Sequence, residues 1–194
     1  MSKIIVIEGP DRVGKATQTN FLSNFLLWRG YKVLTIEVPI RTNFVYHIIY
    51  WMLRNGLAKK FPKCFQWLQY FNRQLFQWFT LKKLEKNYDY IIMDRWSLST
   101  VVYGKATGVP TKFTEKLHAR LRTPEFTFLL LGPSHKHSAE DVYESDATLQ
   151  ENVRKIYLEW SEQHSHSCKV IDCTQSREII AEEIRTKLKE LNLC

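Results

Sequence analysis

Hydrophobic residues along the chain follow two patterns that alternate, short continuous apolar runs and longer stretches with helical spacing. The run from Ile4 to Ile7 is β-branched and has no polar residue within it, which is typical of a strand buried on both faces of a parallel sheet. Four further runs predict strands over residues 31–38, 88–93, 126–131 and 169–172. The periodic stretches between them predict helices over residues 18–28, 41–55, 63–86, 97–106, 112–122, 147–164 and 176–191.

This order of elements predicts an α/β fold, a five-stranded parallel sheet with helices on both faces. No Ser/Gly-rich linker or internal repeat interrupts it, so residues 1–194 are expected to form one domain. Residues 134–145 are polar and lack periodicity, and we expect a lid segment at about 133–146. Ligands of such folds bind at the carboxyl ends of the strands.

Composition and charge narrow the class of protein. The 28 Lys and Arg residues exceed the 20 Asp and Glu residues, which gives a net charge of +8. Because no basic run is interleaved with aromatic residues, this excess favours a site for polyphosphates and a solvated surface over a nucleic-acid-binding module. There is no signal peptide or membrane-length apolar stretch, and the four cysteines lack metal-ligand spacing, so a cytoplasmic protein with free thiols is expected.

A glycine-punctuated loop follows the first predicted strand. Gly9, Gly14 and Lys15 fit the spacing G-x-x-x-x-G-K, in which backbone N–H groups and a helix N-terminus surround a phosphate. Ala16 stands where a Ser or Thr usually ligates Mg²⁺, and Thr17 comes one residue too late to replace it. We predict phosphate binding by these five residues, with a strand-to-helix turn that binds no ligand as the alternative.

Polar residues also follow the next two predicted strands. Pro39 and Arg41 come after the second strand, and Asp94 and Arg95 come directly after the third. P-loop enzymes hold Mg²⁺ or its waters with an aspartate placed like Asp94. The alternative for Asp94 is a carboxylate that caps the N-terminus of the next helix.

Several motifs carry a resemblance to a known family. In chain order they are Glu8 to Lys15, Asn72-Arg73, Asp94-Arg95 with Ser99 and Tyr103, and Val142-Tyr143-Glu144 ahead of Gln150. With them the sequence resembles the thymidylate kinases, P-loop nucleoside monophosphate kinases, over nearly the whole chain. The resemblance implies that the γ-phosphate of ATP is transferred to dTMP with Mg²⁺ and a closing lid.

The same resemblance implies roles in catalysis. Arg12 would be the catalytic arginine that the cellular, non-bacterial branch of the family places inside the loop, where it follows the charge on the γ-phosphoryl group. Residues 134–145 contain no arginine, which agrees with that branch. Lys15 and Asp94 complete the catalytic set, and Asp94 would hold Mg²⁺ directly or through water. The alternative for Arg12 is a solvated loop charge.

The resemblance also implies a site for the acceptor nucleotide. Arg41 and Arg95 would clamp the monophosphate, since a guanidinium matches a phosphate bidentately. Asp11 would accept a hydrogen bond from the 3′-hydroxyl, Arg73 would contact the pyrimidine edge, and Tyr103 would lie against the sugar. The predicted set is completed by Pro39, Gln69, Ser99 and Tyr143, the last of which would close over the base. Ordinary core packing is the alternative for the aromatic residues.

Departures from the family pattern leave the base selectivity open. Gln69 stands where the family usually places an aromatic residue one turn before Arg73, and Val38 and Ile40 flank Pro39 where the family commonly has Phe-Pro-Glu. Ala16 removes one ligand of Mg²⁺, for which we expect weakened metal affinity. The alternatives are a kinase for another or modified deoxynucleoside monophosphate, a deoxynucleoside kinase and a catalytically silent nucleotide-binding protein.

Two predicted helices carry more aromatic residues than one side of a sheet needs. These residues are Trp51, Phe65, Trp67, Phe71, Phe76, Trp78 and Phe79, on helices 41–55 and 63–86. They predict a homodimer formed through these helices, as the family resemblance also implies, with a larger private core as the alternative.

Overall fold

The computed structural model describes residues 2–132 and 146–194. Its five strands are β1 (Lys3–Glu8), β2 (Val33–Glu37), β3 (Tyr90–Asp94), β4 (Phe126–Leu131) and β5 (Cys168–Asp172). They pair in parallel in the order β2-β3-β1-β4-β5, which confirms the predicted five-stranded parallel sheet. The predicted lid, apart from residue 146, lies outside the described residues, and so does Tyr143.

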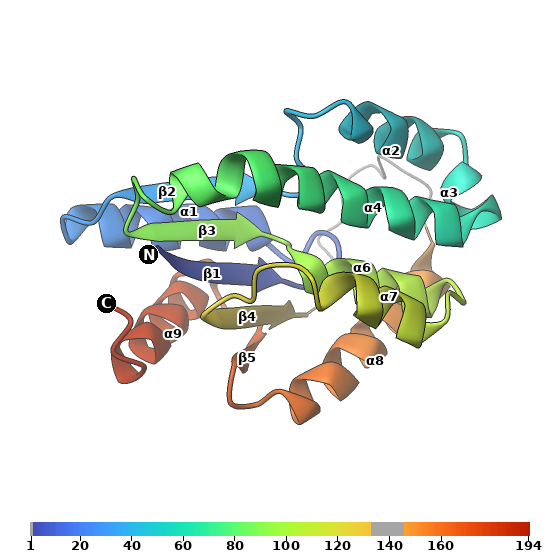
Figure 1. Cartoon of the computed structure of the whole chain (residues 1–194). Helices are drawn as coiled ribbons and strands as arrows, with labels where there is room; N and C mark the ends of the chain where they lie inside the picture. Colours follow the sequence, from blue (N-terminus) through green and yellow to red (C-terminus); the bar gives the residue numbers. More distant parts are fainter. Residues whose placement is uncertain (1, 133–145) are drawn as a thin grey trace.

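Helices connect the strands and cover the sheet (Figure 1). In chain order they are α1 (Lys15–Trp28), α2 (Val45–Arg54), α3 (Leu57–Lys60), α4 (Pro62–Phe76), the π-helical turn η1 (Gln77–Leu81), α5 (Lys82–Leu84), α6 (Ser97–Ala106), α7 (Thr111–His118), α8 (Ala147–Gln163) and α9 (Arg177–Glu190). No helix in the described part of the chain is long and apolar enough to cross a membrane.

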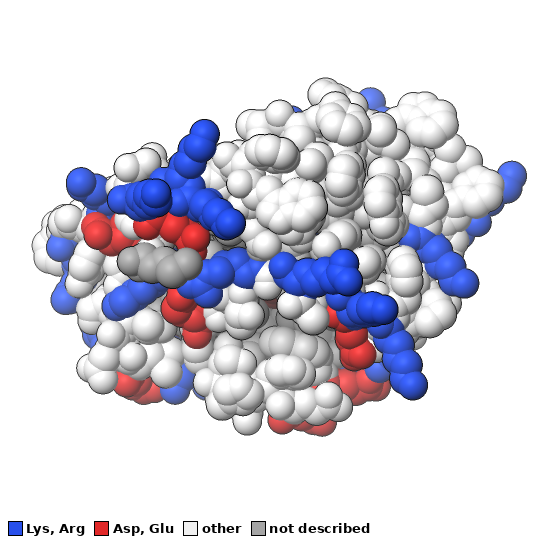
Figure 2. Space-filling view, viewed as in Figure 1, with Lys and Arg blue, Asp and Glu red and all other residues white. Residues whose placement is uncertain are grey.

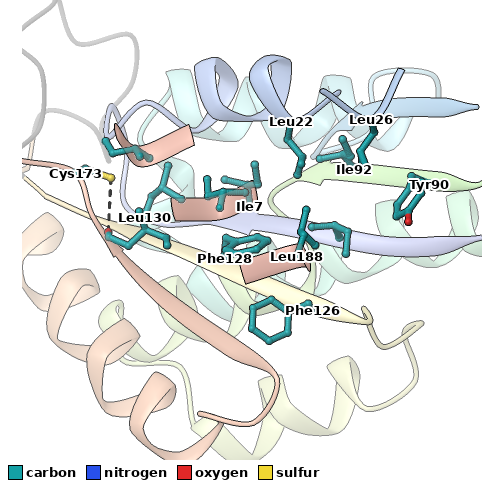
Figure 3. Close-up of a cluster of buried hydrophobic side chains, with 14 of the residues drawn as sticks. Ile7, Leu22, Leu26, Tyr90, Ile92, Phe126, Phe128, Leu130, Cys173 and Leu188 are labelled. Atoms are coloured by element: carbon teal, nitrogen blue, oxygen red, sulfur yellow. Dashed lines mark hydrogen bonds between the residues drawn. The ribbon is translucent and has the colours of Figure 1, made fainter. Parts of the chain in front are cut away.

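Buried side chains on both faces explain why the strands lack polar alternation. Ile5 and Ile7 of β1 pack with Leu22 and Leu26 of α1 in a cluster that also holds Leu188 of α9 (Figure 3). The alternate residues of β1 face a different cluster, to which α4 contributes. Since successive side chains of a strand point to opposite faces, a sheet covered on both sides requires a continuous apolar run.

One predicted helix is wrong as a continuous element. Residues 63–86 form α4, the π-helical turn η1 and the short α5 instead of one α-helix. Within η1, Leu81 is buried while Trp78 and Phe79 are exposed. A π turn adds one residue to a helical turn without needing Gly or Pro, so the sequence pattern gives no sign of it. The helix predicted over 41–55 is also shorter, because α2 begins only at Val45.

The carboxyl ends of β1, β2, β3 and β4 lie at one edge of the sheet, because the four strands are parallel and in register (Figure 1). Glu37 of β2 is paired with Asp94 of β3, which follows Met93, the partner of Val6 in β1. This edge brings the phosphate-loop motif together with the polar residues that follow β2 and β3.

Candidate functional site

The loop between β1 and α1 requires glycine where the sequence has it. Gly9 has a φ of 148°, and a Cβ atom there would lie 2.3 Å from the carbonyl oxygen of Leu130. Gly14 has a φ of 92° and precedes Lys15, the first residue of α1, with no side chain capping this helix. The N–H groups of the first turn are therefore available to an anion, as a phosphate-binding loop requires.

Lys15 is buried at the base of this loop. Its side chain is 8% exposed, and Nζ donates a hydrogen bond of 2.6 Å to the carbonyl oxygen of Pro10. Burial and, after it, the positive charge of Arg95 lower the pKa of Lys15 to about 8, against the opposite effect of Asp11, Asp94 and Glu8. A bound polyphosphate would stabilise the ammonium form, so this lysine is suited to binding one.

Asp94 ends β3 next to the loop. Burial raises the pKa of its carboxyl, which the positive charge of Lys15 opposes. The carboxylate of Asp94 accepts no hydrogen bond from the described residues. The next helix, α6, begins at Ser97, and its N-cap residue Trp96 provides no side-chain cap. The alternative that Asp94 caps the N-terminus of this helix is therefore wrong. Mg²⁺ needs few protein ligands because it keeps several waters and takes phosphate oxygens. Asp94 fits this requirement, while Ala16 offers no oxygen from its side chain.

Asp11 lies at the centre of a polar network. Its carboxylate forms an ion pair with Arg95 and accepts hydrogen bonds from the hydroxyl of Tyr103 at 2.6 Å and from Nε2 of Gln150 at 3.0 Å. Burial alone would raise the pKa of Asp11, but Arg95 and then Lys15 outweigh it and lower the pKa to about 2. The network joins the phosphate loop to α6 and α8, and the negative charge of Asp11 at neutral pH is balanced by the positive charge of Arg95.

A cavity of about 460 Å³ opens beside this network. Its walls come from the segment after β2, from α2 and α4, and from α6. Eight residues predicted to bind the acceptor line it: Asp11, Pro39, Arg41, Gln69, Arg73, Arg95, Ser99 and Tyr103. Arg12, Lys15 and Asp94 are not among its lining residues and belong to the loop side of the site.

Two of the cavity arginines have contrasting surroundings. Arg41 is exposed and forms an ion pair with Glu37, 2.8 Å between Nη2 and Oε2. Arg73 is only 2% exposed, and burial lowers its pKa to about 10, a shift that Glu8 opposes. Both side chains are therefore cationic at neutral pH, one at the mouth of the cavity and one inside it.

Glu8 was not predicted as a site residue, yet it connects three elements. Its buried carboxylate accepts hydrogen bonds from the backbone N–H groups of Trp96 and Ser99 at 2.8 and 3.2 Å and from the Ser99 hydroxyl at 2.5 Å. The hydroxyl of Tyr157 on α8 donates a further one at 3.0 Å. Glu8 thus caps α6 from a distant strand, and α6 carries Ser99 and Tyr103 into the cavity wall.

Gln150 and Thr100 were also missed as site residues. Gln150 contacts Asp11 from α8, and Thr100 lines the cavity with a buried hydroxyl that has no hydrogen-bond partner among the described residues. Position in the sequence gives no signal for either residue. For Glu8, an acid at the end of an apolar strand is such a signal, since a charge there must be paired.

Comparison with known proteins gives consistent results. The profile of the family described as thymidylate kinase matches residues 7–184. Proteins named thymidylate kinase are 28% identical in Bartonella henselae, over 93% of this chain and 92% of the relative, and 26% identical in Methylococcus capsulatus, over 97% and 96%. The solved thymidylate kinases of Candida albicans and Ehrlichia chaffeensis superpose with TM-scores of 0.79 and 0.78.

These two solved structures share 20% and 19% sequence identity with the chain. The first superposition covers 98% of this chain and 92% of the other, and the second covers 96% and 98%. The fold is therefore that of the P-loop nucleoside monophosphate kinases, as the sequence predicts.

Proposed function

Because the chain belongs to the thymidylate kinase family, we propose that it transfers the γ-phosphate of ATP to dTMP and releases ADP and dTDP. The observation that carries this proposal is the ion pair between Asp11 and Arg95. It lies where the phosphate loop meets the cavity, so that a nucleotide held by the loop and a monophosphate held by Arg95 would face each other.

On the donor side, the loop and the N-terminus of α1 would bind the phosphates of ATP. Lys15 would contact the β and γ phosphates, and Arg12, held in the loop at a φ of 64°, would stabilise the negative charge of the γ-phosphoryl group as it transfers. Phosphoryl transfer needs positioning and charge stabilisation more than covalent chemistry. Two cations close to the transferring group supply both.

On the acceptor side, Arg95 and Arg41 would clamp the monophosphate of dTMP. Each is now paired with a carboxylate, Asp11 or Glu37, which keeps the guanidinium in place before the phosphate arrives. Asp11 would then accept a hydrogen bond from the 3′-hydroxyl of the sugar. Tyr103, whose hydroxyl contacts Asp11, would lie against the sugar ring.

The base would lie in the inner part of the cavity with Pro39, Gln69 and Arg73. Ser99 supports this wall through its contact with Glu8 and accepts a longer hydrogen bond of 3.4 Å from Arg95. Binding of dTMP in this orientation directs its phosphate toward the loop. We expect Tyr143, which lies outside the described residues, to approach from the side of the predicted lid.

Asp94 would hold Mg²⁺ directly or through water. The ion supplies charge neutralisation on the phosphate oxygens of ATP when bound. Asp94 and the phosphate oxygens are the ligands that this site offers it, since Ala16 lacks a hydroxyl.

Substitution of Ala16 by Ser is expected to lower the Mg²⁺ concentration for half-maximal rate about threefold or more, because it restores one oxygen ligand. The measurement is the steady-state rate at saturating ATP and dTMP over a Mg²⁺ titration. Asn20→Ser, which introduces the same hydroxyl at an exposed position one turn further along α1, serves as the control and should leave the titration unchanged. An unchanged midpoint in Ala16→Ser would show that Mg²⁺ does not use this position.

The activity itself is tested with a panel of acceptors. ADP release from ATP and Mg²⁺ is measured with dTMP, dUMP, dCMP, dGMP, dAMP and thymidine. We expect dTMP to give the highest kcat/KM and thymidine to give none above background, because Arg95 and Arg41 need a phosphate to bind. Preference for thymidine would indicate a deoxynucleoside kinase, and binding without turnover would indicate a silent nucleotide-binding protein.

We also propose that two copies of the chain form a homodimer through α2, α4 and η1. Trp51 of α2 is 57% exposed and Phe79 of η1 is 67% exposed, and Trp67 of α4 and Trp78 of η1 are exposed as well. Figure 2 shows a broad area without charged residues over α2 and α4. Phe65 and Phe76, by contrast, belong to the core. The mass in solution, measured by light scattering, tests this assembly, and the proposal requires the mass of two chains.

We also propose that the protein is cytoplasmic, where its proposed substrates ATP and dTMP would be available.

A further inference from the structure

The proposed active site accounts for little of the net charge of +8. Five cations and four carboxylates belong to this site: Arg12, Lys15, Arg41, Arg73, Arg95, Glu8, Asp11, Glu37 and Asp94. Their charges nearly cancel, so most of the excess positive charge lies on other parts of the molecule. Excess charge of one sign attracts partners of the opposite sign.

Some of this positive charge gathers where α1 and α9 end. The two helices pack against each other. Helix α1 has 14 residues and begins at the phosphate loop, so its last turn lies about 20 Å from that loop. In Figure 1 the last turns of α1 and α9 lie at the end of the molecule that holds both termini, away from the carboxyl edge of the sheet. A ligand bound there would not occupy the proposed active site.

Three cations surround one aromatic ring at this end of the molecule. The Cζ atoms of Arg185 and Arg29 lie 5.3 and 5.9 Å from the centroid of the Phe25 ring, and Nζ of Lys189 lies 5.9 Å from the same centroid. Contact with the ring stabilises each cation, but the three like charges repel one another. Arg185 has one carboxylate partner, Glu182 at 3.4 Å, and the side chains of the other two have none among the described residues. An anionic ligand would balance this cluster.

An exposed indole lies beside these cations. Trp28 is 86% exposed, the largest exposed fraction of any large hydrophobic side chain in the described part of the chain. It follows Phe25 by three positions, so the two side chains are neighbours on the surface of α1. The negative end of a helix dipole favours cations nearby, but it does not account for the tryptophan. We define the basic patch as Phe25, Trp28, Arg29, Arg185 and Lys189.

We propose that the basic patch binds single-stranded nucleic acid. Proteins that bind single strands combine cations for the phosphates with aromatic rings on which bases stack. A base would stack on the indole of Trp28, and the neighbouring phosphates would contact Arg29 and Lys189. A duplex offers this ring no unstacked base. The residues of the patch come from two helices far apart in the sequence, so no basic run predicts it.

An anionic membrane is the other large anionic partner that cations and a tryptophan could meet. A helix that lies on a membrane needs a broad apolar face. Along residues 18–28 of α1, the exposed residues are Asn20, Asn24, Leu27 and Trp28. Two of these four side chains are amides, so the apolar surface is limited to the last turn. The composition of this surface therefore favours nucleic acid over a membrane.

The test measures fluorescence anisotropy of a labelled single-stranded DNA of about 20 nucleotides and mixed sequence, over a series of salt concentrations. ADP and dTMP are present at high concentration to occupy the proposed active site. We expect Trp28→Leu to weaken binding about fivefold or more, and Trp28→Phe, which keeps a ring, to stay within about threefold of the wild type. In the double variant Arg29→Ala/Lys189→Ala, the slope of log K against log salt should become less steep by about 1.4.

The matched control is Lys112→Ala/Lys116→Ala. It removes two exposed lysines from α7, a helix that packs on the opposite face of the sheet from α1. Its affinity should stay within about twofold of the wild type, and its salt slope should be unchanged.

Three results would overturn the inference. The first is no binding of the oligonucleotide by the wild type at about 50 mM salt. The second is equal affinity in the wild type, Trp28→Leu and Arg29→Ala/Lys189→Ala. The third is binding to vesicles of phosphatidylserine and phosphatidylcholine, weakened in the same variants, without binding to the oligonucleotide. The inference does not depend on the proposed function, since the assay needs no phosphoryl transfer.

Discussion

Substitution of Lys15 by Ala should lower kcat for phosphoryl transfer about a hundred- to a thousandfold, the usual cost of removing one preorganised charge from a transition state. Lys15 is buried beneath the phosphate loop, and its contact with the carbonyl oxygen of Pro10 keeps Nζ within the loop. A water molecule in place of Nζ would carry no positive charge to stabilise the transferring phosphate. The measurement is kcat with saturating ATP, Mg²⁺ and dTMP.

The matched control is Lys32→Ala, which removes an exposed lysine before β2 and should leave kcat unchanged. Retention of more than a tenth of the wild-type kcat in Lys15→Ala would show that the loop does not act on the transferring phosphate. The pH dependence gives a second readout. Because the pKa of Lys15 is about 8 in the free protein, kcat/KM for ATP should fall as pH rises through about 8 and Nζ loses its proton.

Substitution of Glu8 by Ala should destabilise the protein by about 3 to 5 kcal/mol. Glu8 is 0% exposed, and its removal leaves the backbone N–H groups of Trp96 and Ser99 buried without an acceptor. Each such group costs roughly 1 to 3 kcal/mol. The loss also removes a negative charge that favours the buried guanidinium of Arg73. Urea unfolding followed by circular dichroism measures the change.

Tyr157→Phe is the control for this network. It deletes one hydroxyl that donates to Glu8 and leaves the three other hydrogen bonds in place, so we expect a loss of about 1 kcal/mol. If Glu8→Ala and Tyr157→Phe were equally stable, Glu8 would not be the acceptor that holds the N-terminus of α6. A variant Glu8→Ala that fails to fold would agree with the expected effect.

The strands could be predicted from the sequence because burial on both faces leaves a direct pattern. Ile4 to Ile7 read as a strand without alternation, and β1 indeed lies at the centre of the sheet. The break of the helix over residues 63–86 could not be predicted, since a π turn depends on which side chains the sheet can accommodate. Local helical spacing was the same on both sides of that turn.

In the candidate site, too, features that depend on neighbouring residues in the sequence could be predicted, and contacts between distant residues could not. The turn that holds Gly9, Gly14 and Lys15 could be predicted because a loop of this kind depends on nearby residues with fixed backbone requirements, and its binding of phosphate stays a prediction. Gln150 contacts Asp11 across 139 positions of the chain, and such a partner depends on how α8 packs against the loop. Asp94 ends β3, as the sequence predicts. The carboxylate that caps the N-terminus of α6 is not Asp94 but Glu8, which ends the neighbouring strand β1.

Arg73 and Gln69 show how a local departure acquires meaning from the fold. The sequence alone showed only that an aromatic residue was missing one turn before Arg73. The structure shows that Gln69 accepts a hydrogen bond from the guanidinium that lines the cavity. An exposed glutamine and one that holds a buried cation look identical in sequence, because burial at this position depends on α6 and the segment that follows β2.

The most direct test of the account is to identify the products formed from ATP, Mg²⁺ and dTMP by chromatography or ³¹P NMR. The structure places the glycine-containing loop after β1 beside a cavity lined by Arg41 and Arg95, the two residues that we propose bind the acceptor phosphate. We therefore expect ADP and dTDP in equal amounts and no product from thymidine. Formation of dTMP from thymidine, or the absence of dTDP at every Mg²⁺ concentration, would contradict the assignment of this chain as a working thymidylate kinase.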